Sequence, residues 1–264
     1  MKIIFLGTGT SVGIPVIGCD CGVCQSSDPR NNRLRSSLYV VVDELHLVID
    51  TSPDFRQQAL RHRIPRVDAV LVTHSHADHI FGLDEVRRYN TLQNEVIPVY
   101  ASDETVGDLR RIFNYIYVEA PPGTFRPRLE MIAVADSFRL GQVRVTPIPV
   151  IHGHVKTLGF RIDAGRHSLG YVPDCQEMPE RSLALLQGLD VMILDALRHR
   201  PHATHLTVEG SVAVLQRIGA RRSYLTHMCH DLDHAETQAI LPAGIEVSWD
   251  GLTVEVESTA DDRD

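Results

Sequence analysis

One short segment of the sequence gathers four side chains that can bind metal ions. It reads Thr73-His74-Ser75-His76-Ala77-Asp78-His79 and includes the end of an apolar run, residues 69–73, that is typical of a buried strand. In extended backbone His74 and His76 point to the same side, while Asp78 and His79 come where a helix begins. Neutral imidazole and carboxylate are ligands of catalytic zinc, which keeps one position open. The segment therefore predicts ligands for two different metal ions.

Other ligand-type residues also follow apolar, strand-like runs. They are Asp50 after residues 45–49, His152 after 143–150, Asp174 after 167–172 and His227 after 223–226. Loops at strand ends are where binding sites are commonly built. His154 competes with His152, and we prefer His152 because it lies closer to the strand end. We expect these residues to converge with the first segment along one edge of the fold.

Three of the five cysteines fall within six residues, Cys19-Asp20-Cys21-Gly22-Val23-Cys24. An odd count without a secretory segment argues against a disulfide framework, and neighbouring thiols are better explained as metal ligands in a reducing compartment. We therefore expect a cytoplasmic protein. The alternative is a redox-sensitive loop, or thiols without a shared role. Cys175 and Cys229 are expected to be buried small residues.

The elements that position these residues alternate along the chain. Strands are expected at 2–6, 38–42, 45–49, 69–73, 97–100, 130–134, 143–150, 157–162, 167–172, 190–194, 223–226, 245–248 and 252–256. Helices are expected at 53–61, 80–90, 103–113, 179–187, 207–218 and 234–240. The remaining expectations are a long irregular loop over about 7–36, a loop at 120–123 and a frayed tail at 261–264. Many strands with fewer helices predict two sheets flanked by helices, in one domain over residues 1–264.

Composition narrows the classes of protein that fit. The 264 residues are 43% hydrophobic and 23% charged, with a net charge of −8 and 14 histidines. These values argue for a globular chain, and no apolar run approaches the ~20 residues of a membrane span. The acidic balance argues against stable binding of nucleic acid. Gly7 and Gly9 follow a strand, but their spacing and the residues after them do not fit a dinucleotide-binding loop.

Together, the residues at the strand ends resemble the metallo-β-lactamase superfamily of binuclear metal hydrolases. The resemblance implies an αββα sandwich of the α/β class, with Asp50 as a structural aspartate. It also implies one metal on His74, His76 and His152, a second on Asp78, His79 and His227, and Asp174 between them. Zinc is the expected metal, and Mn²⁺ is the alternative because such sites accept either ion.

The cysteines indicate which family within this superfamily the sequence resembles. Cys19, Cys21 and Cys24 with His230 form a Cys₃His set of the kind that holds structural zinc. With the opening Leu6-Gly7-Thr8-Gly9-Thr10 and the pair His227…His230, this set resembles the PhnP-type phosphodiesterases of cyclic ribose phosphates. The resemblance implies a small or cyclic phosphodiester as substrate, no membrane partner and a homodimer.

A final candidate is His205, which lies at a point where PhnP-type enzymes and the transfer-RNA 3′-processing nucleases place a proton-donating histidine. An alkoxide leaves poorly unless it is protonated, and Asp195 is placed to orient such an acid. Three other histidines, His199, His202 and His234, are expected at the surface.

The function that follows is phosphodiester hydrolysis by a hydroxide shared between two metals, with Asp174 fixing that nucleophile and His205 as the acid. Alternatives on the same fold are an RNA-processing nuclease, a glyoxalase-type thioesterase or a lactamase. The nuclease would need a long basic arm, and the loop at 120–128 is too short for one. A zinc-binding protein without catalysis is the alternative from another class.

Overall fold

The computed structural model describes residues 1–118, 121 and 123–256. Within these residues the strands form two sheets of seven. The first sheet has the order β14-β1-β2-β3-β4-β5-β6, with β14 at Thr253–Glu255, β1 at Lys2–Gly7, β2 at Ser37–Val42, β3 at Leu45–Ile49, β4 at Ala69–Leu71, β5 at Ile97–Ala101 and β6 at Leu129–Ala133.

The second sheet is built from the later part of the chain. Its order is β13-β12-β11-β10-β9-β8-β7, with β13 at Ile245–Val247, β12 at Arg222–Thr226, β11 at Val191–Asp195, β10 at His167–Val172, β9 at Val155–Ala164, β8 at Val143–His152 and β7 at Phe138–Leu140. The first and last strands of the described residues meet in the first sheet, where β1 pairs with β14.

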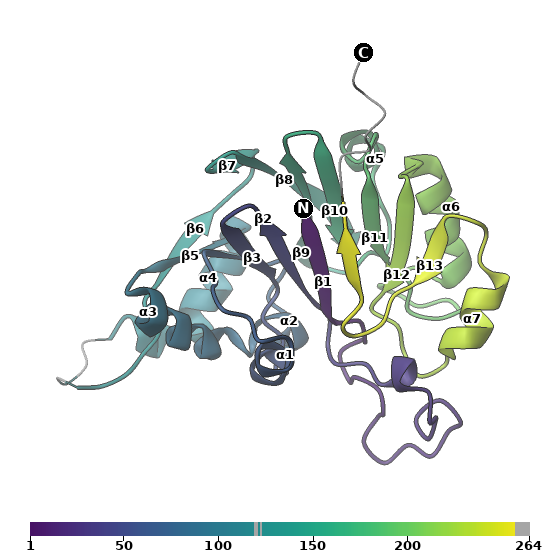
Figure 1. Ribbon diagram of the computed structural model, residues 1–264, viewed down its shortest axis with the longest axis horizontal. Helices are drawn as coiled ribbons and strands as arrows, with labels where there is room; N and C mark the ends of the chain where they lie inside the picture. Colours follow the sequence, from purple (N-terminus) through teal and green to yellow (C-terminus); the bar gives the residue numbers. More distant parts are fainter. Residues whose placement is uncertain (119–120, 122, 257–264) are drawn as a thin grey trace.

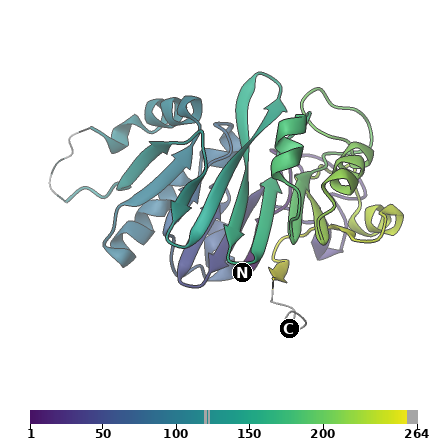
Figure 2. The ribbon, with the colours of Figure 1, turned by 90° about the horizontal axis from the view of Figure 1, so that it is seen from above.

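Helices cover the outer faces of both sheets (Figures 1 and 2). They are α1 at Phe55–His62, α2 at Ala77–Ile80, α3 at Arg87–Gln93, α4 at Asp103–Ile112, α5 at Glu180–Leu185, α6 at Val208–Ile218 and α7 at His234–Ile240, with short 3₁₀ turns η1 at Pro29–Asn31, η2 at Leu83–Val86 and η3 at Asn114–Ile116. Local sequence sets some of these ends. The hydroxyls of Ser102 and Thr207 accept hydrogen bonds from the first turns of α4 and α6, and Gly219 ends α6 in the left-handed conformation.

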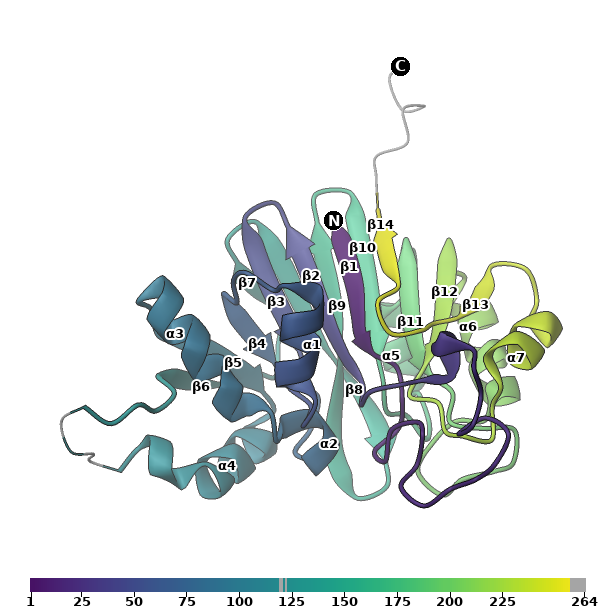
Figure 3. The same ribbon diagram turned by 60° about the horizontal axis from the view of Figure 1, so that its bottom comes forward.

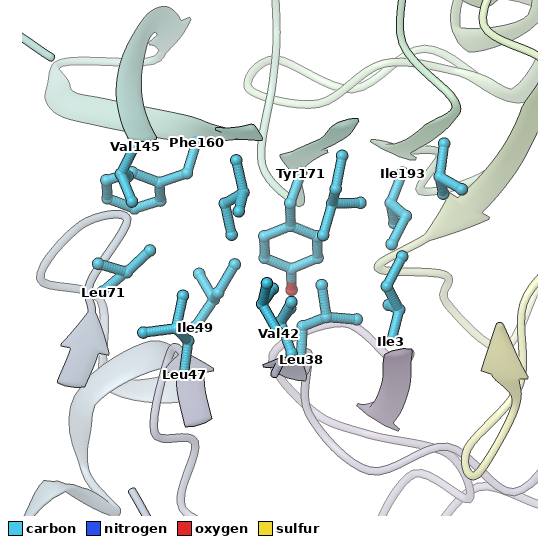
Figure 4. Close-up of a cluster of buried hydrophobic side chains, with 14 of the residues drawn as sticks. Ile3, Leu38, Val42, Leu47, Ile49, Leu71, Val145, Phe160, Tyr171 and Ile193 are labelled. Carbon is cyan, nitrogen blue, oxygen red and sulfur yellow. The ribbon is translucent and has the colours of Figure 1, made fainter. Parts of the chain in front are cut away.

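The main core lies between the sheets (Figure 4). Side chains such as Leu38 and Ile49 from one sheet point toward Phe160, Tyr171 and Ile193 from the other. Two further cores fill the spaces between the first sheet and α1, α3 and α4, and between the second sheet and α5 and α6. The fold is therefore the expected αββα sandwich, because each sheet buries both faces.

Strand direction brings the chemistry to one edge. The strands β3, β4, β5 and β6 run parallel, as do β10, β11, β12 and β13. β8 shares the direction of β10, because both are antiparallel to β9. Carboxyl ends of parallel strands lie at the same edge of a sheet, so the loops after β3, β4, β8, β10, β11 and β12 meet.

Several elements differ from the sequence-based expectation. The helix expected at 80–90 is three short pieces, α2, η2 and α3. Gly82 lies between the first two, and a Cβ there would come within 2.0 Å of the Ser52 carbonyl oxygen, so the chain turns tightly against the loop after β3. β7 was not expected, since three residues carry little periodicity. The expected tail at 261–264 and part of the loop at 120–123 lie outside the described residues. Among the described helices, none combines the length and apolar character that a membrane span requires.

Candidate metal centre

Seven imidazole and carboxylate side chains converge where the strand-end loops meet. Three groups of ligand atoms, each within 4.8 Å of one another, comprise His74, His76 and His152; Asp78, His79 and His227; and His74, His79 and Asp174. Asp174 joins the groups, since its two carboxylate oxygens lie 3.1 Å from His79 Nε2, 3.4 Å from His227 Nε2 and 3.7 Å from His152 Nε2. The structure thus brings together every residue that the sequence placed at this site. His152 lies in the cluster, whereas His154 is exposed.

Hydrogen bonds from outside the cluster fix the histidine tautomers. His79 Nδ1 donates to Asp50 at 2.7 Å, and His152 Nδ1 donates to the Thr204 carbonyl at 2.8 Å. Thr73 donates its hydroxyl to Asp50 and can accept from His74 Nδ1 at 3.0 Å. Each ring therefore turns Nε2 toward the centre of the cluster, as metal-binding histidines do.

The backbone is held in an uncommon conformation at two positions of the site. Asp50, directly after β3, has φ of 63°, and His227, directly after β12, has φ of 60°. Such left-handed conformations are unfavourable for residues other than glycine and cluster at functional sites. Here the turns direct the Asp50 and His227 side chains to the edge where the sheets meet.

The buried carboxylates of the metal-ligand cluster need positive charge beside them. Burial alone would lower the pKa of His79, but Asp174, Asp78 and Asp50 outweigh it and hold that pKa well above the usual value. Burial alone would raise the pKa of Asp174, and the neighbouring His227 and His79 hold it well below instead. In contrast, burial lowers the pKa of His74 and lowers that of His152 to about 4, so these rings are neutral.

Unpartnered atoms show where that positive charge would lie. The buried atoms Nε2 of His79, Nε2 of His227 and Oδ2 of Asp174 have no hydrogen-bond partner. Buried polar atoms are almost always paired, so lone pairs that face one another across a small space mark a place for a cation. Nitrogen and carboxylate oxygen donors suit zinc and similar divalent ions. The residues present therefore fit the metals that the fold family implies.

His205 and Asp195 lie beside this cluster. Asp195 is the last residue of β11, is fully buried, and accepts a hydrogen bond from His205 Nδ1 at 2.9 Å. The other ring nitrogen, Nε2, lies 3.8 Å from Asp174 Oδ1. Burial raises the pKa of Asp195 and lowers that of His205. The pair thus holds one proton on the Nδ1 side and presents Nε2 to the cluster.

The N-terminal loop lies beside the segment after β12 (Figure 3). A second cluster of ligand-type side chains joins the two. The sulfurs of Cys19, Cys21 and Cys24 lie 3.2, 3.6 and 3.5 Å from Nδ1 of His230. Hydrogen bonding to the Cys24 backbone lowers the pKa of Cys21 to about 7, whereas burial raises that of Cys24 to about 11. Three sulfurs around one imidazole nitrogen form a four-ligand set of the kind that holds structural zinc. Cys175 and Cys229 are buried, as expected.

One histidine was placed wrongly from sequence. His234 is not at the surface: it is 2% exposed, packs on Trp249 and lies 3.3 Å from the Arg33 guanidinium. The reason is that the N-terminus of α7 is covered by the long loop, whose Asn31 binds both Asp233 and the His234 backbone. His199 and His202 are exposed, as expected.

Sequence reasoning also missed two residues that orient the site. Thr73 and Thr204 bind His74 and His152 from behind, and neither is an expected ligand type. Thr73 is part of the histidine-rich segment and could have been found there. Thr204 acts through its backbone carbonyl across 52 positions, and a carbonyl leaves no signal in sequence.

Comparison with known proteins supports the same reading. A family profile described as the beta-lactamase superfamily domain matches residues 46–228. The crystal structure of a diphosphatase from the PhnP family superimposes with a TM-score of 0.89 at 43% identity, covering 97% of this chain and 98% of that one.

Two more distant relatives add to this. An octanoyltransferase of Porphyromonas gingivalis is 35% identical over 96% of this chain, which spans 51% of that protein, about half its length. Zinc-bound PqqB from Methylobacterium extorquens shares the fold, with a TM-score of 0.79 at 23% identity over 97% of this chain and 100% of that one. The profile match and the identity along nearly the whole chain show that this protein belongs to the beta-lactamase superfamily, as a PhnP-family member with the metallo-β-lactamase fold.

Proposed function

We propose that the protein is a metal-dependent phosphodiesterase that cleaves small or cyclic phosphodiesters. The observation that carries this proposal is the position of His205. Its Nε2 faces the metal-ligand cluster, and its Nδ1 is bound to a buried carboxylate. A thioesterase on this fold has no need for such an acid because a thiolate leaves readily as an anion, whereas the departing alkoxide of a phosphodiester needs one.

Seven side chains would hold two divalent cations. One cation fits His74, His76 and His152, the other fits Asp78, His79 and His227, and Asp174 lies between them. When bound, zinc or manganese ions supply charge to neutralise the phosphate and make water acidic enough to act as a nucleophile near neutral pH. Asp50, Thr73 and Thr204 keep the ligand rings in the tautomers that this requires.

His205 provides the proton for the leaving group. With both nitrogens protonated, it keeps Nδ1–H on Asp195 and transfers the Nε2 proton to the oxygen whose bond to phosphorus breaks. The ring is then neutral and regains its proton from water. Asp195 stabilises the charged ring and prevents rotation, because it also accepts the backbone N–H groups of Cys175 and Leu206.

The second cluster would hold a zinc ion with no part in the reaction. Cys19, Cys21, Cys24 and His230 offer four ligands, which is a complete tetrahedral set. Because His230 follows His227 by three positions, this ion would tie the long loop to the segment that carries a ligand of the catalytic site.

A diphosphate linkage is a second candidate substrate, since the PhnP-family relative at 43% identity is a diphosphatase. The chemistry at phosphorus is the same, but a phosphate leaving group is stable as an anion and needs less help from an acid. The two candidates therefore differ in how much they depend on His205.

The test uses the purified protein, stripped by chelator and reloaded with Zn²⁺ or Mn²⁺. Three substrates are compared: an alkyl phosphodiester, bis(4-nitrophenyl) phosphate, whose leaving group is activated, and a diester of diphosphate. His205→Ala should lower kcat on the alkyl ester by about 10²–10⁴-fold and much less on the other two. His199→Ala, on the same exposed loop, is the control and should change none of the rates.

Metal content distinguishes a general acid from a metal ligand, because His205→Ala should bind as much metal as the wild type. Equal losses on all three substrates would remove His205 from the role of general acid. A wild-type protein that hydrolyses none of them with either metal would contradict the phosphodiesterase proposal itself.

A further inference from the structure

The loop after β11 carries several basic side chains, and most of them are occupied. Arg198 donates to the carbonyls of Arg200 and Pro201, Arg200 pairs with Asp231 at 2.9 Å, and His199 pairs with Glu209 at 2.6 Å. His202 differs, because its contacts leave one ring nitrogen open. Its Nδ1 lies 3.3 Å from the Thr204 backbone nitrogen and 3.2 Å from the Thr204 hydroxyl.

These contacts determine which nitrogen of His202 carries the proton. The Thr204 backbone N–H can only donate, so Nδ1 of His202 must be the acceptor. In the neutral ring the proton is then on Nε2, at the far edge of the ring from Thr204. His202 is exposed, so Nε2–H is a hydrogen-bond donor available to a ligand.

His202 is also the outermost member of a row of four imidazole rings. Ring centroids are 5.8 Å apart between His79 and His227, 4.8 Å between His227 and His205, and 5.2 Å between His205 and His202. Exposure rises along the row, from a fully buried His79 to an exposed His202. The row runs from the metal ligands, past the acid, to an exposed side chain at the protein surface.

The position of the general acid, His205, indicates which half of the substrate lies near His202. In the proposed function His205 protonates the departing oxygen, so the atoms attached to that oxygen lie close to His205. His202 is the next imidazole in the row beyond His205, and it is exposed. Thr204 holds both ends of this arrangement, since its carbonyl orients the ligand His152 while its N–H orients His202.

We propose that His202 binds the leaving half of the substrate, donating Nε2–H to an oxygen near the scissile bond. This inference rests on the proposed phosphodiesterase function and adds a preference to it. The favoured leaving groups carry a hydroxyl or a phosphate oxygen beside the departing oxygen, as sugars and polyols do. Plain alkyl groups offer no acceptor and lose this contact.

The experiment compares two alkyl phosphodiesters that differ in one hydroxyl next to the departing oxygen. On the metal-loaded wild type, the hydroxylated ester should have a kcat/KM about 10-fold higher, the effect of one hydrogen bond. His202→Ala should remove this preference by raising KM for the hydroxylated ester, with little change for the deoxy ester.

Two conservative variants sharpen the test. The amide nitrogen of glutamine can occupy the place of Nε2, whereas asparagine can replace only Nδ1. His202→Gln should therefore keep part of the preference, and His202→Asn should lose it although it can still bind Thr204. His199→Ala is the control and should keep the full preference. Nitrogen NMR of the histidine side chains should show His202 as the Nε2–H tautomer.

A binding measurement tests this inference independently of the proposed function. Both esters are titrated into metal-loaded His205→Ala and into the double variant His205→Ala/His202→Asn. A preference in binding that only the double variant loses supports the His202 contact, even if the wild type hydrolyses neither ester and the proposed function fails. Equal affinity of both esters for His205→Ala, or equal losses on both esters in His202→Ala, would overturn the inference.

Discussion

The two clusters of ligand-type side chains differ in burial, in number of ligands and in what holds them. The histidine and aspartate cluster lies at strand ends, and His74, His79 and Asp174 are almost fully buried. The cysteine cluster lies in a loop, and Cys19, Cys21 and Cys24 are partly exposed. A second set of residues, including Asp50 and Thr204, orients the first cluster, whereas His230 alone provides the nitrogen of the second.

This difference indicates that the first cluster is suited to a reaction and that the second is suited to holding a loop in place. Four ligands around one point leave no position for a substrate, while seven ligands shared by two ions leave the space that a reaction needs. The first cluster contains unpartnered buried atoms, including Nε2 of His79, Nε2 of His227 and Oδ2 of Asp174. We therefore expect changes in the first cluster to affect rate and changes in the second to affect stability.

The largest effect is expected for Asp174→Asn. It removes the carboxylate between the two proposed metals, so both ions should be lost and activity should fall by on the order of 10³-fold or more. Elemental analysis should find about one metal per chain, at the cysteine cluster. A variant that keeps three metals and loses only rate would show that Asp174 acts in the chemistry and not in binding.

The sequence predicted the metal-ligand residues of this cluster better than the residues that hold those ligands in place. Each ligand follows an apolar run, and strand direction makes these runs end together, so the residues Asp174 and His227 could be expected at one edge. The β2–β3 hairpin and the capped helix α6 were also predicted, because their signals are local. Thr204 and the buried position of His234 could not be, because both depend on contacts between segments that are distant in sequence.

A smaller effect on rate is expected for Asp195→Asn. The amide cannot stabilise a charged His205, so kcat on an alkyl phosphodiester should fall by about 10–10²-fold while metal content stays close to that of the wild type. The alkaline limb of the pH profile of kcat should move to lower pH, because less of His205 is protonated at any pH. An unchanged profile would mean that Asp195 serves only the fold, through its bonds to Cys175 and Leu206.

Cys21→Ser should affect stability and not rate. Loss of one thiolate should release the proposed structural ion, so metal content should fall by one per chain and the Tm by roughly 5 °C or more. The kcat of the remaining folded protein should stay within about threefold of the wild type. Cys229→Ser is the matched control, since Cys229 adjoins His230 without facing the cluster. A large loss of kcat in Cys21→Ser alone would show that the loop also shapes the catalytic site.

The smallest expected difference between the two clusters is in the number of protons that each releases when it binds metal. A thiol must lose its proton to bind zinc, and the pKa values of about 7 for Cys21 and about 11 for Cys24 place one release near neutral pH and one well above it. In metal-free protein these two thiols should make affinity rise about tenfold per pH unit above pH 7, where Cys24 is the one of the two that is still protonated. Below pH 7 the rise should be about a hundredfold per unit, because Cys21 is protonated too.

The rings of His74, His76 and His152 behave differently, since burial holds their pKa values below the ordinary range and they are already neutral at pH 7. These three ligands therefore add no pH dependence between pH 6.5 and 8. Chelator competition can read each site alone, using Asp174→Asn for the cysteine cluster and Cys21→Ser for the histidine ligands. His79, whose pKa is held well above the usual value, must release one proton when a metal binds. A steeper slope below pH 7 for the cysteine cluster than for the histidine cluster supports the division between the clusters. Equal slopes would show that proton release does not distinguish them, and that the thiols are ionised before the metal binds.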